Sequence, residues 1–271
     1  MKYCRFVSPD GPRFGLVETL AGSEQITQSA PDGPVTDFSK AQKVPPLSLA
    51  TARLLYPAVA SKIVCVGRNY SDHAKELGNE VPSEPLIFLK PPSSLISPGE
   101  PIVRPKHLSQ RVDFEGELTV VIGKKCRGLK PGADVKPYIL GYTCANDVSA
   151  RDIQFGDIQV LRGKSLDTFC PLGPWIVTGD EIPNPNSLKI KSWLNGRLMQ
   201  DSNTNLMIFS IPFLVSFLSQ YFTLVPGDII LTGTPRGVGV FRDPPMFMKE
   251  GDEVTVEIER IGRLVNTCRT R

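Results

Sequence analysis

Short hydrophobic runs separated by glycine and proline residues follow one another along the chain. Alternation within a run predicts a strand with one buried face, and a continuous apolar run predicts a strand buried on both faces. This pattern predicts strands at Tyr3–Val7, Arg13–Leu20, Ile63–Val66, Pro85–Leu89, Val112–Ile122, Tyr138–Ala145, Trp175–Val177, Leu188–Leu194, Asp228–Leu231 and Glu253–Ile258. Helical patterns are fewer, at Asn69–Leu77, Ser149–Val160 and Ser210–Phe222. We therefore expect a mostly β, α+β fold with a few helices on its faces or rim.

The pattern changes near residue 60. Before it, short alternating runs are broken by Asp10-Gly11 and Asp32-Gly33 and are followed by a proline-bounded connector, Pro45–Pro57. From Lys62 onward, longer strand patterns recur to the end of the chain. We predict a small β-rich N-terminal region over residues 1–60 and a larger domain over residues 61–271.

Composition excludes several classes of protein. Among 271 residues, 31 Lys and Arg stand against 28 Asp and Glu, and this mild excess predicts binding neither to nucleic acid nor to a membrane surface. Leu206–Val225 has the length of a membrane span, but polar residues and Pro212 interrupt it, so a helix packed against a sheet is predicted. Six cysteines without C-x-x-C spacing predict reduced thiols in an intracellular protein. No transit peptide is visible, so the cytoplasm and the mitochondrion both remain open.

The clearest candidate site begins with three acids, Asp113, Glu115 and Glu117, which alternate along one predicted strand and would share one face. That face is either polar and solvated, or it holds a cation. Asp147 directly follows another apolar run, at a strand-to-helix junction. It is either a helix cap or a further oxygen ligand. Together, Glu115, Glu117 and Asp147 would suit Mg²⁺, Mn²⁺ or Ca²⁺.

A second candidate feature is the only histidine placed in a helical pattern. His73 and Glu76 are three residues apart, so on a helix they face the same way. The carboxylate would then orient the imidazole and raise its basicity, although a surface pair on a short helix is the more frequent explanation of this spacing. Two further segments suit a small anion: Lys164 beside Gly163, and the glycine-rich turn Thr232–Val240. The turn lacks the pattern of a nucleotide-binding P-loop.

Taken together, these segments resemble the fumarylacetoacetate hydrolase superfamily in order and spacing over about residues 60 to 260. The stretches that carry the resemblance are Gly67–His73, Asp113–Leu118, Asn146–Asp152, Gly163–Ser165 and Thr232–Gly239. Two others, Phe169–Pro174 and Val238–Pro245, most resemble the domain-containing 2 branch of that family.

The resemblance implies a mixed β-sandwich roll of the fumarylacetoacetase C-terminal type, usually a homodimer, with one divalent cation in each active site. By matching position, the metal ligands would be Glu115, Glu117 and Asp147. Lys164 would contact a substrate oxygen, Arg151, Gln154 and Thr234 would bind substrate, and His73 with Glu76 would activate water. The cation would be Mg²⁺, with Mn²⁺ or Ca²⁺ as alternatives.

The implied substrates are short 2-oxo or 2,4-dioxo acids, whose common intermediate is an enolate stabilised by the cation. Hydrolysis of a C–C bond in an acylpyruvate comes first, because both members of the water-activating pair are present. Decarboxylation of oxaloacetate would use the same enolate. The alternative is an oxaloacetate keto–enol tautomerase, to which the branch resemblance points. A catalytically silent metal- or carboxylate-binding protein is a further alternative, which would bind metal without turning over any oxo acid.

Overall fold

Strands dominate a computed structural model of the chain, which describes residues 1–34, 38–76 and 81–271, without the side chains of residues 73–75. The mostly β prediction is therefore confirmed. The strands are β1 (Lys2–Ser8), β2 (Gly11–Leu20), β3 (Ser23–Pro31), β4 (Gln42–Ser48), β5 (Leu54–Leu55), β6 (Ile63–Gly67), β7 (Leu86–Lys90), β8 (Leu95–Ile96), β9 (Ile102–Arg104), β10 (Val112–Asp113), β11 (Gly116–Ile122), β12 (Ile139–Asn146), β13 (Ser149–Ala150), β14 (Cys170–Thr178), β15 (Lys189–Leu194), β16 (Arg197–Asn203), β17 (Ile229–Leu231), β18 (Glu253–Ile258) and β19 (Gly262–Thr270). The helices are α1 (Ser71–Glu76), α2 (Arg151–Gly156), α3 (Leu161–Lys164) and α4 (Ile211–Tyr221), with 3₁₀ turns at Phe38–Lys40, Pro92–Ser94, Lys136–Tyr138, Thr204–Leu206 and Gly239–Phe241.

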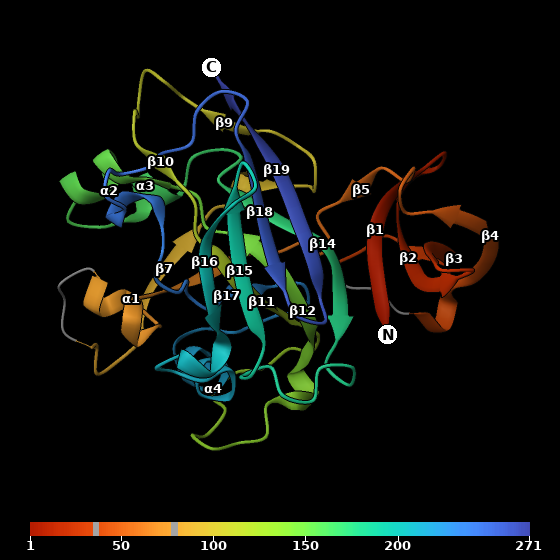
Figure 1. Ribbon diagram of the computed structural model, residues 1–271. Coiled ribbons are helices and arrows are strands. Elements are labelled where there is room, and N and C mark those ends of the chain that lie inside the picture. The colour runs from red at the N-terminus through yellow and green to blue at the C-terminus, as the bar shows by residue number, and fades with distance from the viewer. Residues whose placement is uncertain (35–37, 77–80) are drawn as a thin grey trace.

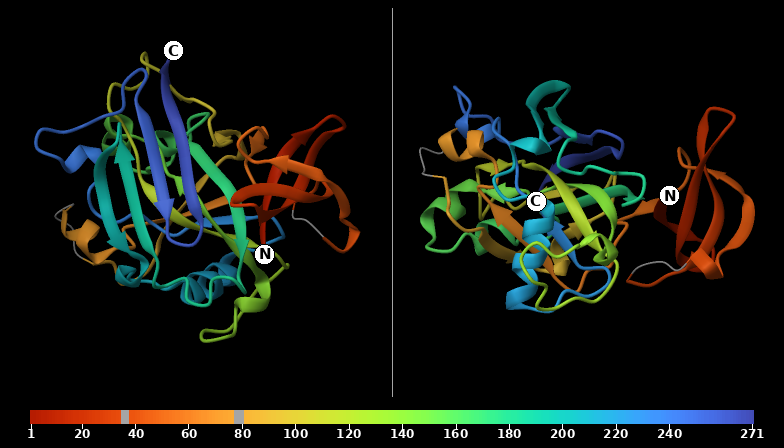
Figure 2. Two further views of the ribbon diagram at one scale, coloured as in Figure 1. Left: turned by 45° about the vertical axis from the view of Figure 1, so that its right-hand side comes forward. Right: turned by 90° about the horizontal axis from the view of Figure 1, so that it is seen from below.

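One long sheet runs through the molecule in the order β4-β3-β2-β1-β14-β12-β11-β17-β6-β7. The small β-rich N-terminal region is present, and it extends this sheet, because β1 pairs with β14 through Lys2↔Val177 and Tyr3↔Ile176. In Figures 1 and 2 these N-terminal strands stand on one side of the molecule, and helices α1, α2 and α3 lie on the opposite side.

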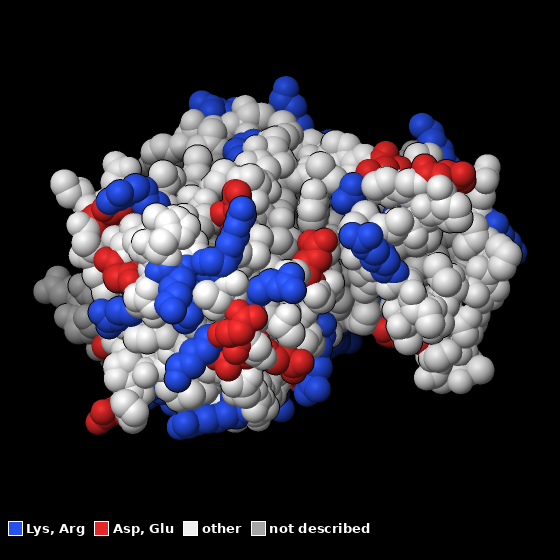
Figure 3. All heavy atoms as spheres, turned by 90° about the horizontal axis from the view of Figure 1, so that it is seen from above, with Lys and Arg blue, Asp and Glu red and all other residues white. Residues whose placement is uncertain are grey.

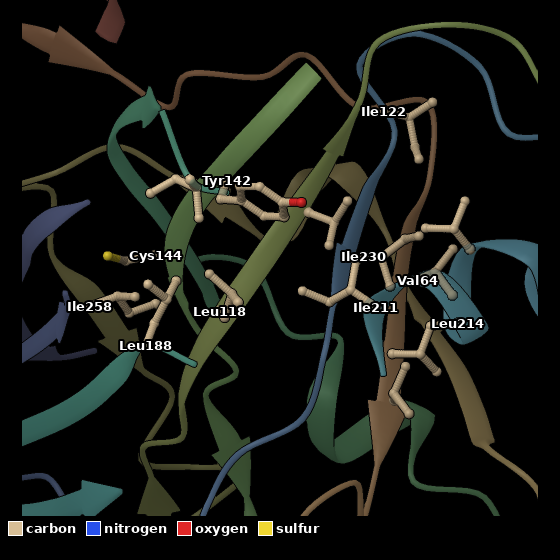
Figure 4. Packing of buried hydrophobic residues seen from close by; sticks show 14 of the residues in the cluster. Val64, Leu118, Ile122, Tyr142, Cys144, Leu188, Ile211, Leu214, Ile230 and Ile258 are labelled. Atoms are coloured by element: carbon tan, nitrogen blue, oxygen red, sulfur yellow. The ribbon is translucent and has the colours of Figure 1, made fainter. Parts of the chain in front are cut away.

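A second sheet, in the order β16-β15-β18-β19-β9, packs against the long one. The largest core cluster lies between them and takes Leu118 from β11, Ile258 from β18 and Leu214 from α4 (Figure 4). Burying a leucine or isoleucine side chain contributes about 1.5–3 kcal/mol, so this cluster is the main support of the fold. It fixes β11 and β12, whose ends carry the candidate site.

Helix α4 packs against the sheet as the sequence predicts, and it places Ile211, Leu214, Val215 and Leu218 in this core. Among the described residues, no helix is long and apolar enough to cross a membrane. On the molecular face in Figure 3, basic and acidic side chains are interspersed, which agrees with the nearly balanced composition.

Some predicted elements differ in the structure. The predicted strand Val112–Ile122 is interrupted between β10 and β11, because the Glu115 N–H donates to the Asn146 side chain at 2.9 Å instead of to a neighbouring strand. The predicted helix Ser149–Val160 is wrong at both ends. Its first two residues form β13, which pairs with β10. Helix α2 then stops at Gly156, a poor helix former.

Candidate active site

A cavity of about 300 Å³ is lined by residues of α2 and α3, among them Arg151 and Lys164. In the long sheet, β11 pairs with β12 through Gly116↔Asn146 and Glu117↔Ala145. This pairing brings the acids of the site together. The Asp147 N–H then donates to the Glu115 carbonyl oxygen at 2.9 Å, which turns the chain after β12 beside the break before β11. Segments thirty residues apart therefore meet at one point.

Three carboxylates form the centre of the site. Oxygen atoms of Glu115, Glu117 and Asp147 lie within 4.8 Å of one another. All three residues are buried, with at most 6% of their surface exposed, so they do not form a solvated polar face. Carboxylate oxygens converging in this way could hold a hard divalent cation. The alternative of a polar outer face, which the sequence leaves open, is wrong.

Two lysines neutralise part of this charge. Lys164 Nζ lies 2.8 Å from Glu115 Oε2 and 2.8 Å from Asp147 Oδ2. Lys90 Nζ lies 2.5 Å from the other Asp147 oxygen, Oδ1. Burial alone would lower the pKa of Lys164, but the Asp147 and Glu115 carboxylates outweigh it and raise this pKa. Lys164 is therefore a fixed ammonium ion at neutral pH.

Arg151, at the start of α2, joins a further acid to the cluster. Its Nε donates to Asp113 Oδ2 at 2.9 Å, and its Nη1 lies 2.7 Å from Glu115 Oε1. Nη1 also donates to the Gln154 side chain at 2.9 Å. Nη2 lies 2.9 Å from Asp113 Oδ2 but makes no hydrogen bond to any described residue. Arg151 lines the cavity together with its partners Glu115 and Gln154.

Glu117 is the acid without a cationic partner. Its carboxylate accepts a hydrogen bond from the Gly233 N–H at 2.7 Å, and no ion pair joins it to any residue the structure describes. Burial, and then the charges of Asp147 and Glu115, raise the pKa of Glu117 well above its usual range. A nearby cation would reverse this shift.

The charge of the whole cluster is also unbalanced. Four buried carboxylates face three buried cations, which leaves one negative charge in excess; the members are Asp113, Glu115, Glu117, Asp147, Lys90, Arg151 and Lys164. A fully ionised cluster is therefore costly: without a metal the raised pKa of Glu117 favours its protonated form, and a bound divalent cation would instead keep all four acids ionised. The residues present therefore fit a divalent metal ion.

The glycine-rich turn after β17 binds the protein's own carboxylates. The Gly233 N–H donates to Glu117, and the N–H groups of Gly239 and Val240 donate to Asp113 at 2.8 and 3.0 Å. Thr234 lines the cavity, but its hydroxyl donates to the Gly116 carbonyl oxygen at 2.9 Å and accepts from Gln200 at 2.7 Å. The turn thus positions acids of the site. The sequence analysis did not predict this role of the turn.

Helix α1 brings Glu76, one member of the predicted pair, to the same turn. The Gly237 N–H lies 3.2 Å from both carboxylate oxygens of Glu76. The side chain of His73 lies outside the described residues, so its pairing with Glu76 stays a prediction. The predicted helix Asn69–Leu77 begins later, at Ser71.

Sequence reasoning missed Lys90, which is the last residue of β7 and is fully buried at its side chain. A lysine that closes an apolar run and precedes Pro91-Pro92 is the one available signal, since lysine is almost never buried unless it is paired. Asp113 is recognisable as an acid of the strand, but its role in holding Arg151 depends on a contact across 38 residues.

Two protein-family models match the chain. The one described as fumarylacetoacetate (FAA) hydrolase C-terminal matches residues 62–269, and one described as Rv2993c-like, N-terminal, matches residues 1–57. The first match contains every acid and lysine of the cluster.

Individual proteins of known structure or name are also similar. Human mitochondrial oxaloacetate tautomerase FAHD2A is 49% identical over 98% of this chain and 91% of its own length. The structure of 5-carboxymethyl-2-hydroxymuconate delta-isomerase from Mycobacterium smegmatis has a TM-score of 0.86 and 39% identity, with both chains covered in full. Maleylpyruvate hydrolase from Sphingobium sp. SYK-6 has a TM-score of 0.78 and 30% identity, also over both full chains.

Proposed function

We propose a reaction for this chain from the premise that it belongs to the fumarylacetoacetate hydrolase family. It is an enzyme of that family, whose members act on oxo acids. The reaction we propose is keto–enol tautomerisation of a short 2-oxo dicarboxylic acid such as oxaloacetate. The extensive similarity to an oxaloacetate tautomerase supports this choice over hydrolysis, which the sequence motifs alone place first.

The observation that carries the proposal is the buried acid triad bridged by Lys164 within a cavity of about 300 Å³. That volume is at the lower end of the range for ligand cavities, so it suits a small acid. Tautomerisation moves one proton between carbon and oxygen, and negative charge develops on the oxygen of the enolate. Fixed positive charge beside that oxygen lowers the barrier, because it is already oriented before the reaction.

A divalent cation completes this site in our proposal. Glu115, Glu117 and Asp147 would hold Mg²⁺ or Mn²⁺, which would supply a Lewis acid for the 2-oxo and carboxylate oxygens of the substrate. The excess negative charge of the cluster supports this assignment.

The chain's own residues have separate roles. We assign Lys164 to the developing enolate oxygen, since its ammonium is held at the triad by two carboxylates. Arg151 and Gln154 would bind the substrate carboxylate, since both line the cavity beside the triad and the Gln154 oxygen already accepts from Arg151. Because the Thr234 hydroxyl proton is already donated to Gly116, Thr234 would assist through its backbone N–H.

Hydrolysis of a C–C bond remains a second candidate because of α1. Glu76 accepts from Gly237 in the glycine-rich turn, whose Gly233 donates to Glu117, and His73 is on the same helix as Glu76. This pair would deprotonate a water molecule for attack on the distal carbonyl group of an acylpyruvate. Similarity to maleylpyruvate hydrolase also supports it.

A product-resolved assay separates the two reactions. Oxaloacetate and acetylpyruvate are supplied in parallel with Mg²⁺, Mn²⁺ or EDTA; ultraviolet absorbance follows the enol, and chromatography measures pyruvate and acetate. We expect metal-dependent loss of enol-oxaloacetate without new products. Metal-dependent release of acetate would instead establish hydrolysis. No metal-dependent change with either acid would contradict both reactions.

We further propose that the enzyme is a homodimer. The exposed apolar residues Phe155 and Ile158 line the cavity, and Leu161 beside them is also exposed, which supports an interface there. Light scattering should give twice the chain mass of 29.7 kDa. A mass of one chain at micromolar concentration would contradict it.

A further inference from the structure

Arg68 lies at the mouth of the cavity, directly after β6, and none of the roles assigned above uses it. Arg68 is exposed to solvent, and its side chain forms no hydrogen bond or ion pair with any residue that the structure describes. Arginine is a bidentate donor suited to carboxylates. An arginine lining a cavity without a protein partner is therefore ready to bind an anion there.

The backbone holds Arg68 in this position at a cost. Its φ angle is +55°, in the left-handed region that side chains longer than those of Asn and Asp rarely adopt. Strained conformations of this kind persist where surrounding contacts determine them, and they cluster at functional sites.

The surrounding contacts come mainly from the next residue, Asn69, which is fully buried. Its amide donates to the carbonyl oxygens of Phe209 and Thr232 at 3.0 and 2.8 Å, and its oxygen accepts from the Phe209 N–H at 2.7 Å. Gly233 packs so closely that an added Cβ would lie 2.8 Å from the Asn69 Cβ. With Asn69 clamped, the preceding side chain is directed outward to the cavity it lines.

Arg68 differs from the other charged residues that line the cavity. Lys164 and Arg151 are buried and bound to the acids of the cluster. The remaining wall is largely apolar, with Leu86, Phe88 and Phe155. Asp157 also lines the cavity, but its carboxylate accepts from Arg162 Nε at 2.7 Å. Arg68 is thus the one cation without a carboxylate partner among the described lining residues.

We propose that Arg68 recognises the second carboxylate of a four-carbon 2-oxo dicarboxylic acid, and so determines the preference for a dicarboxylate over a monocarboxylate. This rests on the proposed function, in which the first carboxylate and the 2-oxo group lie at the acid triad. The substrate then spans the cavity from the buried cluster to its mouth.

The test compares oxaloacetate with 2-oxobutanoate, which carries a methyl group in place of the second carboxylate. Binding of each acid to the Mg²⁺-loaded protein is measured by calorimetry, beside the KM and kcat of oxaloacetate tautomerisation. Arg68→Asn is the main variant, because asparagine tolerates the left-handed conformation. We expect oxaloacetate affinity to fall about tenfold and its KM to rise similarly, with 2-oxobutanoate affinity unchanged. The melting temperature should be unchanged or higher, since the strain is relieved.

Arg197→Gln is the matched control, because Arg197 is exposed and lines the neighbouring cavity rather than this one. Equal loss for both acids in Arg68→Asn, or an equal effect of Arg197→Gln, would overturn the assignment, as would a wild-type protein that binds both acids alike. If the wild-type protein binds oxaloacetate more tightly in an Arg68-dependent way yet shows no tautomerisation, the proposed reaction fails and the role of Arg68 stands.

Discussion

At the scale of single residues, the two oxygen atoms of Asp147 are each bound by a different buried lysine. Lys164 faces the acid triad, whereas Lys90 approaches from β7 and also donates to the Val148 carbonyl oxygen at 3.2 Å. Lys90 therefore fixes the orientation of the Asp147 carboxylate from the side away from Lys164. We regard Lys90 as a positioning residue.

Replacing Lys90 with methionine should leave Asp147 as a buried charge with one cation fewer. We expect a loss of roughly 3–5 kcal/mol in the free energy of unfolding, together with weaker metal binding, because losing the fixed orientation of Asp147 outweighs the added negative charge. Denaturant unfolding and metal titration measure the two effects. Lys62→Met is the control, because Lys62 pairs with the buried Asp228 away from the cavity. If both variants weakened metal binding equally, the positioning role would be wrong.

Glu117 gives a different prediction. Glu117→Gln removes the acid that has no cationic partner, so the cluster becomes neutral without a metal. We expect the metal-free variant to match the metal-free wild type to within about 1 kcal/mol at neutral pH, because the raised pKa of Glu117 already favours its uncharged form. The stabilisation by Mg²⁺ should disappear. Thermal unfolding with Mg²⁺ or EDTA measures both; a variant still stabilised by Mg²⁺ as the wild type is would contradict the ligand assignment.

At the scale of elements, the glycine-rich turn after β17 connects the acids of the site to α1. Gly237 has φ +103°, and an added Cβ would lie 2.4 Å from the Met199 carbonyl oxygen. The same residue donates its N–H to Glu76. The turn therefore tolerates no side chain at this position and couples α1 to the site.

Gly237→Ala should displace the turn. We expect a loss of about 1–3 kcal/mol in the free energy of unfolding, through left-handed strain and the backbone contact, and a lower kcat. Chemical denaturation and the enol assay measure these changes. Gly156→Ala is the control, since no atom lies within 4 Å of the added Cβ. Wild-type turnover in Gly237→Ala would show that the turn does not position the site.

At the scale of the whole molecule, the N-terminal strands belong to the same sheet as the site strands. The end of β3 is tied to β1 by Arg5, whose guanidinium donates to both oxygens of Asp32 at 2.7 and 2.8 Å. These hydrogen bonds lower the pKa of Asp32 below its ordinary value of 3.8. The pair is partly exposed, so solvent screens it.

The stability that this pair contributes is fully present above about pH 4 and is lost as the pH falls through the lower pKa of the folded state. We expect Asp32→Asn to lower the free energy of unfolding by less than about 1 kcal/mol at pH 7, and to leave it unchanged near pH 2. Unfolding measured from pH 2 to 7 checks this. A cost that stays constant with pH would mean that Asp32 acts through packing instead of charge.

Prediction from sequence worked where the information is local or matches a family pattern. Glu115, Glu117 and Asp147 adjoin apolar runs, and the structure brings them together. Lys90 was missed because its partner is 57 residues away. The break before β11 depends in the same way on the side chain of Asn146. Pairing of β1 with β14 joins two edges far apart in the chain, and no local pattern specifies such partners.

Direct titration of a divalent cation tests most directly whether the excess charge of the buried cluster is a metal site. Calorimetry with Mn²⁺ and Mg²⁺ is carried out on the wild-type protein and on Glu117→Gln, each stripped with EDTA and dialysed. We predict one cation bound per chain in the wild type, and at least about tenfold weaker binding in the variant. Absence of binding in the wild type, or equal binding by both proteins, would contradict the assignment of this cluster as the metal-dependent active site.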